Sequence, residues 1–399
     1  MRAATVVARP LMAVERIIVQ AVVVVTAPVV TQIAKRQASL VKAKNQMEHV
    51  KVPRYSTEFN NNAAATWVLP EGAIARLGRG KINAIAFSSD SECLAAATDI
   101  GLWWYELAIM QPVALSETER GMVSAISFSD TGSRFATGNA DSIVKVWETQ
   151  NQQCVLEVGQ RVLNHGIRQL AFSPDGHYLA ASRTRAPVSV WCAETGRSVR
   201  EYHVEVPKAA GHIFYPICFS PDGTLLAYMS SNDTISVTHL ETGVSIVDFS
   251  IHAARVKHLI FSPCGQFLAA GIQRKDTEPR GAVIYVWNIP KHELETSVEY
   301  SGHWATPTYL PDGSLRVAEV YEGEVAIWDT SQQEKRETFE HHGDMRAARF
   351  SPEGQQFAIA SSRSFQVWRE NAPQVVSLQG HLGHSNSVTF TQNASTPTN

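Results

Sequence analysis

A short sequence motif recurs along most of this chain at a nearly constant interval. The pentapeptide FSPDG occupies residues 172–176 and 219–223, and related segments occur on both sides of them. The anchor residues that begin these segments are Phe87, Phe128, Phe172, Phe219, Phe261, Tyr309, Phe350 and Phe390. Successive anchors are 41, 44, 47, 42, 48, 41 and 40 residues apart. This period is longer than an ankyrin or leucine-rich unit, so a larger repeated unit is expected.

Each period begins like two β-strands joined by a tight turn. Apolar residues alternate in residues 82–87 and 123–128, which is typical of half-buried strands. The SPDG segment predicts a turn, because Pro restricts φ, Asp bonds to nearby backbone and Gly accepts a positive φ. The segments that follow are rich in small residues, as in LAAAT from Leu94 and LAASR from Leu179. A β-hairpin with a crowded second strand is therefore expected.

A third strand in most periods ends on an aromatic residue. Tyr105 occupies this position in the first repeat, and Asp329 follows the aromatic residue of the sixth repeat. The tryptophans at this position are Trp147, Trp191, Trp287, Trp328 and Trp368. Fourth strands are expected near Val113, Val155, Val199, Ile246, Val298, Thr338 and Val376.

The period, the FSPDG turns and the Trp-Asp ending together resemble the WD-repeat (WD40-type) β-propeller family, from residue 73 to about residue 390. The resemblance implies an all-β fold of four-stranded blades around a central channel, most simply seven blades. A helical or unstructured N-terminal segment would precede them. The segments WVLPEG from Trp67 and IGLWWYE from Ile100 look like the bacterial branch of this family.

Two strand candidates are left over, residues 73–77 before the first blade and 386–390 after the last. Propellers commonly close by pairing a strand from one terminus with the blade at the other, which removes exposed edges. We expect residues 73–77 to close the ring in this way, in competition with the segment near Val376. An eighth, incomplete blade is the alternative, and the chain could then be a shortened form of a longer array.

The chain departs from the family pattern in several blades. The Gly-His dipeptide expected before the first strand is present at His212, His303 and His381, but is replaced elsewhere. In the fourth blade, Thr238-His239 stands in place of the tryptophan. The His-Ser-Trp-Asp hydrogen-bond network of many WD blades is therefore expected to be incomplete, with stability resting mainly on packing of the aliphatic strands.

The N-terminal region differs in charge from the rest of the chain. Residues 1–60 carry nine basic and three acidic residues, whereas residues 61–399 carry 26 basic and 35 acidic residues, a net charge of −9. The apolar run within residues 11–34 is short for a membrane span and could be a buried or amphipathic helix, a signal or a membrane anchor. The expected division is residues 1–50 as a basic, apolar and helical segment, 51–72 as a linker, 73–380 as the propeller, and 381–399 as an extra strand and disordered tail.

Composition limits the partners and the compartment. The weakly negative net charge of −3 gives no electrostatic footprint for nucleic acid. Five dispersed cysteines show no paired spacing, which favours free thiols in a reducing, cytoplasmic compartment. Membrane contact through residues 11–34, with tethering or export, remains the alternative.

The chain lacks the linear motifs of common enzymes. No GxxxxGK[ST], GxGxxG, HExxH or GxSxG sequence is present, so neither catalytic residues nor a cofactor are predicted. His341, His342 and Asp344 form the densest group of metal-binding residue types, but their position matches the structural histidine of a WD blade, so no metal site is predicted. Glu322 and Glu324 flank a glycine and are interpreted as a hairpin turn.

The charged loops are the best candidates for partner binding. Residues 273–281, QRKDTEPRG, lengthen the loop between the second and third strands of blade five. Basic residues recur at the equivalent loop of blade three, and such loops on a rigid scaffold are where function tends to lie. The candidate contact residues are Arg183, Arg185, Arg274, Lys275, Asp276, Glu278 and Arg280.

These features predict a monomeric, non-catalytic propeller that binds a protein or peptide on one face or at the channel mouth. The first alternative is a propeller enzyme, a hydrolase or lyase with a His/carboxylate site in the channel. The second alternative is a membrane-tethered or exported binding propeller. The partner itself is not encoded in any readable motif, because fold does not determine function.

Overall fold

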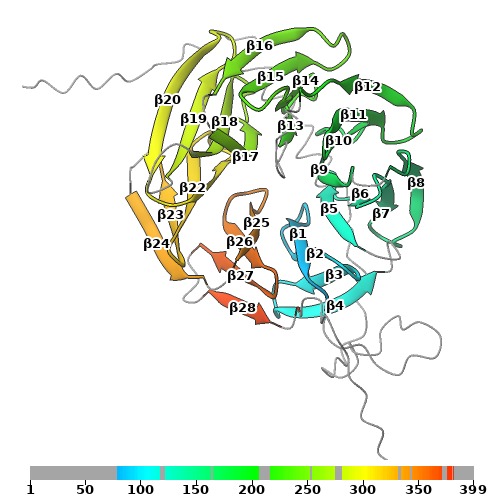
Figure 1. Ribbon diagram of the computed structural model, residues 1–399. Coiled ribbons are helices and arrows are strands. Elements are labelled where there is room, and N and C mark those ends of the chain that lie inside the picture. Colours follow the sequence, from blue (N-terminus) through cyan, green and yellow to red (C-terminus); the bar gives the residue numbers. More distant parts are fainter. Residues whose placement is uncertain are drawn as a thin grey trace, which may run out of the picture. The chain divides into compact units, whose positions relative to one another are not determined.

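Seven four-stranded antiparallel sheets form a ring in the computed structural model (Figure 1). The structure describes residues 79–116, 122–162, 165–205, 216–251, 254–274, 281–330, 334–341, 344–370, 375–379 and residue 381. The regular elements in these ranges are all β-strands, and each sheet is one blade. The seven-blade prediction is confirmed, and the eight-blade alternative finds no counterpart in these ranges.

Within each blade the strands pair in chain order, from the innermost strand to the outermost. Blade one contains β1 (Ile82–Phe87), β2 (Cys93–Thr98), β3 (Gly101–Glu106) and β4 (Gln111–Ser116). Blade two contains β5 (Val123–Phe128), β6 (Arg134–Asn139), β7 (Val144–Glu148) and β8 (Cys154–Val158). Blade three contains β9 (Ile167–Phe172), β10 (Tyr178–Arg183), β11 (Ala186–Cys192) and β12 (Ser198–Tyr202). Blade four contains β13 (Ile217–Phe219), β14 (Leu225–Met229), β15 (Thr234–His239) and β16 (Ser245–Ser250).

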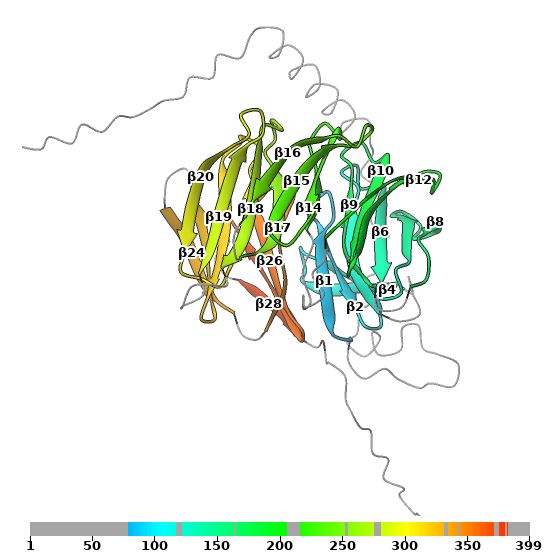
Figure 2. The same ribbon diagram turned by 45° about the horizontal axis from the view of Figure 1, so that its top comes forward.

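The remaining blades follow the same order, and the long strands of blade five are clearest in Figure 2. Blade five contains β17 (Ala254–Phe261), β18 (Phe267–Arg274), β19 (Ala282–Asn288) and β20 (Glu293–Tyr300). Blade six contains β21 (Trp304–Tyr309), β22 (Leu315–Tyr321), β23 (Glu324–Asp329) and β24 (Glu334–Glu340). Blade seven contains β25 (Met345–Phe350), β26 (Gln356–Ser361), β27 (Ser364–Arg369) and β28 (Val376–Gln379).

The FSPDG segments form the predicted turns between the first and second strands. In blade three the Ser173 hydroxyl donates to the Asp175 carboxylate (2.5 Å) and accepts from the Tyr178 amide (2.9 Å). Gly176 has a φ of 73°, which a residue with a side chain adopts only at a cost. The motif therefore recurs because each blade needs the same polar turn, and its anchor residue is the last residue of each blade's first strand.

The core lies between neighbouring blades. The second strands are almost fully buried, and all six residues of β2 are buried. One continuous apolar cluster runs from Val188 in blade three through Leu226 in blade four to Leu268 in blade five. Small residues in these strands let adjacent sheets approach closely, as the repeat pattern predicts. All five cysteines are free thiols.

Blades one and seven meet to close the ring, and their strands lie side by side in Figure 1. Ile82 and Tyr105 of blade one share an apolar cluster with Phe365 of blade seven. The Ile82 amide also donates to the Ser362 carbonyl (3.2 Å). β28, near Val376, is the outermost strand of blade seven as expected.

Other predictions fall on residues that the structure does not describe. The strand candidates at 73–77 and 386–390 are among them, so their role in closure stays a prediction. The helix, linker and membrane predictions for residues 1–72 and the tail prediction for 382–399 also lie outside the described residues. Within the described ranges, no helix has the length and apolar character that crossing a membrane requires.

His381 makes a second polar link across the closure. Its side chain is fully buried, with Nε2 2.5 Å from the Tyr105 hydroxyl and Nδ1 2.9 Å from the Gly80 carbonyl oxygen. Because a carbonyl only accepts, Nδ1 carries the proton and Nε2 accepts from the hydroxyl. The His381 amide donates to the Arg363 carbonyl of blade seven (3.0 Å). One residue therefore bonds both ends of the ring.

We predict that His381→Ala destabilises the protein by about 2–4 kcal/mol, because it leaves a buried cavity and two unpaired polar groups. Thermal unfolding measures the effect. His303→Ala is the matched control, since His303 also follows a glycine before an inner strand but is exposed, and should cost less than about 1 kcal/mol. Equal losses in the two variants would contradict the closure role.

His381 should also make stability depend on pH. Burial, assisted by the nearby charge of Arg79, lowers the pKa of His381 to about 4, against about 6.5 in an unfolded chain. Between these values the unfolded chain binds a proton that the folded chain does not, so the free energy of unfolding falls as the pH falls. The loss is at most about 3 kcal/mol. Melting temperatures across this range should fall less steeply in His381→Asn than in the parent protein.

Candidate functional site

Two of the arginines predicted to contact a partner form ion pairs within their own blades. Arg183, at the end of β10, lies 3.6 Å from the Glu201 carboxylate on β12 and donates to the Ser189 hydroxyl between them. Arg274, at the end of β18, lies 2.7 Å from the Glu299 carboxylate on β20. Both pairs span the third strand of their blade, so part of each positive charge is offset within the protein.

The other predicted contact residues are placed only in part. Arg185 is exposed in the turn between β10 and β11, with a φ of 54°. Antiparallel connectivity places this turn and the β18–β19 loop on the same face of the ring. Lys275, Asp276, Glu278 and Arg280 lie outside the described residues. Their contact with a partner stays a prediction.

Two groups of residues were interpreted above as structural, the group around His341 and the turn around Glu322. Their contacts and backbone angles agree with that interpretation. The His341 ring nitrogen Nδ1 lies 2.8 Å from the Gln366 side-chain oxygen, whereas Asp344 accepts from Ser362 (2.8 Å) and pairs with a neighbouring arginine. His342 lies outside the described residues. Glu322 and Gly323 have φ values of 45° and 86°, which makes the predicted hairpin turn.

The blade tryptophans use different hydrogen-bond partners, as the departures from the family pattern suggest. The Trp147 indole donates to the Thr137 hydroxyl of the second strand (2.9 Å). The Trp328 indole instead donates to the buried Glu319 carboxylate (2.9 Å), which also accepts from the Gly302 amide (2.7 Å). A carboxylate that satisfies several buried donors is a structural group, so Glu319 is not free for acid-base chemistry.

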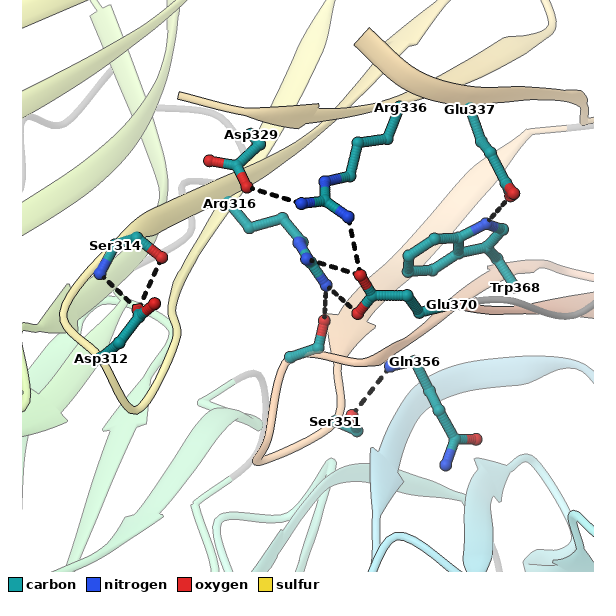
Figure 3. Close-up of polar contacts among 11 residues, drawn as sticks. Asp312, Ser314, Arg316, Asp329, Arg336, Glu337, Ser351, Gln356, Trp368 and Glu370 are labelled. Atoms are coloured by element: carbon teal, nitrogen blue, oxygen red, sulfur yellow. Dashed lines mark hydrogen bonds and ion pairs between the residues drawn. The ribbon is translucent and has the colours of Figure 1, made fainter. Parts of the chain in front are cut away.

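A buried ion cluster joins blades six and seven (Figure 3). Arg316 on β22 is 2% exposed, and its two terminal nitrogens donate to the two oxygens of Glu370, at 3.0 and 3.2 Å. Arg336 reaches the same carboxylate (2.8 Å) and the Asp329 carboxylate (3.2 Å). Arg316 also donates to the Gly354 carbonyl (2.8 Å). Two arginines thus meet two carboxylates, and the charges balance.

The innermost strands carry a different pattern of charge. These are the strands nearest the centre in Figure 1, and their described sequences contain no Asp or Glu. β17 and β25 each carry two basic residues and β9 carries one. The basic residues are Arg168, Arg255, Lys257, Arg346 and Arg349. The described inner strands are therefore basic, although residues 61–399 carry a net charge of −9.

Side chains from three blades converge on His258 of β17. Nη1 of Arg349, on β25, lies 3.2 Å from Nδ1 of His258, across the inner strand of blade six. The Trp304 indole nitrogen on β21 lies 3.2 Å from Nε2 of the same ring and 3.0 Å from the Thr306 hydroxyl. Lys257 lies over the Trp304 ring, 4.7 Å from its centre.

The hydrogen-bond chemistry assigns a neutral His258. A guanidinium and an indole N–H are both donors, so Arg349 presents a donor at Nδ1 and Trp304 presents one at Nε2, and a neutral ring accepts from one of them. Burial and the charges of Arg349 and Lys257 hold the pKa of His258 well below its usual value. Burial, then the Arg255 charge, lowers the pKa of Lys257 to about 8. We call Lys257, His258, Trp304 and Arg349 the axial cluster.

The axial cluster was not predicted from the sequence. The sequence nevertheless contained a signal for it. Aligning the six residues that end at each anchor shows which repeats carry basic residues in the inner strand. Lys257 and Arg346 stand four positions before their anchors, and Arg349 stands one position before its anchor. Their convergence depends on the curvature of the ring, which no local pattern encodes.

The described chain is a seven-bladed β-propeller, and two of its segments match a WD40 family model. Residues 113–148 and 157–185 match the family model described as "WD domain, G-beta repeat". The β-propeller domain of Cps50 (Swd1) from Myceliophteria thermophila superposes with a TM-score of 0.59 at 15% identity, covering 73% of this chain and 97% of that domain. This likeness concerns the fold.

Curated relatives match over shorter segments. Protein HIR1 of Candida albicans is 25% identical over 123 residues, 27% of this chain and 14% of that protein. The small ribosomal subunit protein RACK1 of Caenorhabditis elegans is 27% identical over 107 residues, 26% of this chain and 33% of that protein. SEC12-like protein 1 of Arabidopsis thaliana is 29% identical over 105 residues, 26% of this chain and 24% of that protein.

These relatives are eukaryotic, so the bacterial subgroup suggested by Trp67 and Ile100 is not supported. Short segments at the start of a propeller are weak markers of a subgroup, because blade sequences diverge while turns and core positions recur.

We predict that Glu370→Gln destabilises the protein by about 2–4 kcal/mol, because it leaves the buried Arg316 charge without its bidentate partner. Arg336→Gln should cost less than about 1 kcal/mol, since the Arg336 side chain is 36% exposed. Urea unfolding of the two variants beside the parent protein measures the difference. A loss in Arg336→Gln as large as that in Glu370→Gln would contradict the assignment of Arg316 as the buried partner.

Proposed function

We propose that this protein is a non-catalytic interaction scaffold that binds a protein or peptide partner on one face of its propeller. The proposal rests on one observation. The described acidic side chains Asp329, Glu319 and Glu370 make structural contacts within and between blades. The blades thus form a rigid support, and the loops at the strand ends are left to vary.

The composition of the inner strands weighs against the enzyme alternative. A channel-sited hydrolase or lyase would need a histidine or carboxylate able to exchange protons near neutral pH. The described inner strands have His258, whose pKa is held well below its usual value, and no acidic residue. Basic inner strands of this kind suit binding better than acid-base catalysis.

The face that carries the β10–β11 turn and the β18–β19 loop is the proposed contact face. Arg185 is exposed there, and residues 273–281 give the β18–β19 connection its extra length. Ion pairing of Arg183 and Arg274 stiffens the strand ends that hold these loops. A loop on a stiff base loses less conformational freedom when a partner binds. The name of one relative places it in the small ribosomal subunit.

The test is affinity capture with the full chain as bait, followed by mass spectrometry. In one variant a Gly-Ser segment of equal length replaces residues 275–280. A partner of this face should be recovered by the parent protein and reduced by about tenfold or more in the variant, since truncating a central contact commonly costs that much affinity.

The matched control is Glu241→Ala, in the exposed turn between β15 and β16 on the opposite face. It should recover the partner at the parent level. If the control loses the partner and the loop variant keeps it, the interface lies on the other face of the propeller. A folded parent protein that captures no specific partner would overturn the proposed function.

A further inference from the structure

The arginine at the ring centre is held by neutral groups. Among the described residues, the hydrogen-bond partners of Arg349 are the Ala348 carbonyl (2.9 Å) and the His258 ring (3.2 Å). Burial lowers the pKa of Arg349, yet a guanidinium remains charged at any physiological pH. A partly buried charge with neutral partners is costly unless an anion approaches it.

Arg349 differs from Arg316 in having no acidic partner among its described hydrogen bonds. Arg316 is buried between two blades and binds both oxygens of Glu370. Arg349 occupies an inner strand where no described neighbour along the strand is acidic. Asp344, in the loop before β25, pairs with Arg346 instead (2.7 Å). The protein thus supplies a counter-ion to one buried arginine and a neutral imidazole to the other.

The members of the axial cluster are suited to hold an anionic side chain. Arg349 can donate two parallel hydrogen bonds to a carboxylate or phosphate. Lys257 adds a second positive charge, and burial with the charge of Arg255 holds its pKa at about 8, so it is largely protonated near neutral pH. Trp304 and His258 are partly exposed, and their rings meet edge to face at 64° beside the two basic side chains.

The charge distribution favours a short anionic segment over an extended polyanion. The described inner strands carry five basic residues and no acidic residue, whereas residues 61–399 as a whole are negative. A nucleic acid laid across the surface would meet net repulsion away from the centre. A peptide needs to place only one or two anionic side chains at the axis.

We infer that the axial cluster of Lys257, His258, Trp304 and Arg349 binds an anionic side chain, carboxylate or phosphate, of a peptide segment that inserts at the centre of the ring. The inference rests on the proposed function as a peptide-binding propeller and names the chemistry of the segment it takes. Arg349 contacts the anion, and His258 orients Arg349 through its ring nitrogen.

The test uses the full chain and fluorescent octapeptides. Octaglutamate should bind at least about tenfold more tightly than octaserine, and inorganic phosphate should compete with it. An octaserine carrying one phosphoserine tests whether the site prefers phosphate or carboxylate. Tighter binding of that peptide supports the site and assigns phosphate, whereas tighter binding of octaglutamate supports it and assigns carboxylate.

Two variants locate the binding. Arg349→Gln should weaken octaglutamate binding about tenfold or more, because it removes the charged donor pair while keeping an amide. Arg197→Gln makes the same charge change in the exposed turn between β11 and β12 and should leave affinity unchanged. Octaglutamate should raise the melting temperature of the parent protein and of Arg197→Gln, but not that of Arg349→Gln.

Several results would overturn the inference. Equal affinity of the parent protein for octaglutamate and octaserine would overturn it. Unchanged octaglutamate affinity in Arg349→Gln would also overturn it. If the protein binds octathymidylate more tightly than the peptides, and Arg349→Gln loses that binding, the ligand of the site is a nucleic acid and not a peptide. A captured partner that binds Arg349→Gln as well as the parent protein would leave the proposed function intact and reject only the axial site.

Discussion

The structure depends on the burial of both faces of every blade by its neighbours. A single four-stranded blade exposes apolar residues on two faces, so the array is stable only when the ring closes. The cluster that runs from Val188 to Leu268 shows this packing between successive blades. At the closure, where no chain connection joins blades one and seven in sequence order, His381 and the Ile82 amide add polar bonds to the apolar contact.

Polar groups inside the ring distinguish the blades from one another. The tryptophan position is repeated, but its indole donates to a hydroxyl in blade two and to a carboxylate in blade six. The Arg316–Glu370 pair occurs at one junction, between blades six and seven. Such groups must all be satisfied when they are buried, so each blade tolerates only its own set of neighbours. This gives a repetitive chain a defined order of blades.

The same repeat geometry creates the candidate binding chemistry. Closing the ring brings seven inner strands together, and residues such as His258 and Arg349, 91 positions apart, come within hydrogen-bond distance. Lys257 and Arg349 belong to different blades, and both come close to the paired rings of His258 and Trp304. The β10–β11 and β18–β19 connections and the axial cluster are therefore the two features of this rigid support for which we propose contacts.

The sequence by itself determined the repeated strands and their turns, because the FSPDG period and the residues after Phe172 act locally and repeat, whereas it left seven and eight blades open. It also indicated that Glu322 and Glu324 flank a turn. Only the tertiary structure decided that Arg183 and Arg274 pair within their blades, that Arg316 is buried, and that Arg349 meets His258. Those contacts depend on the curvature of the ring and on pairing between distant strands, and residue spacing along the chain carries neither.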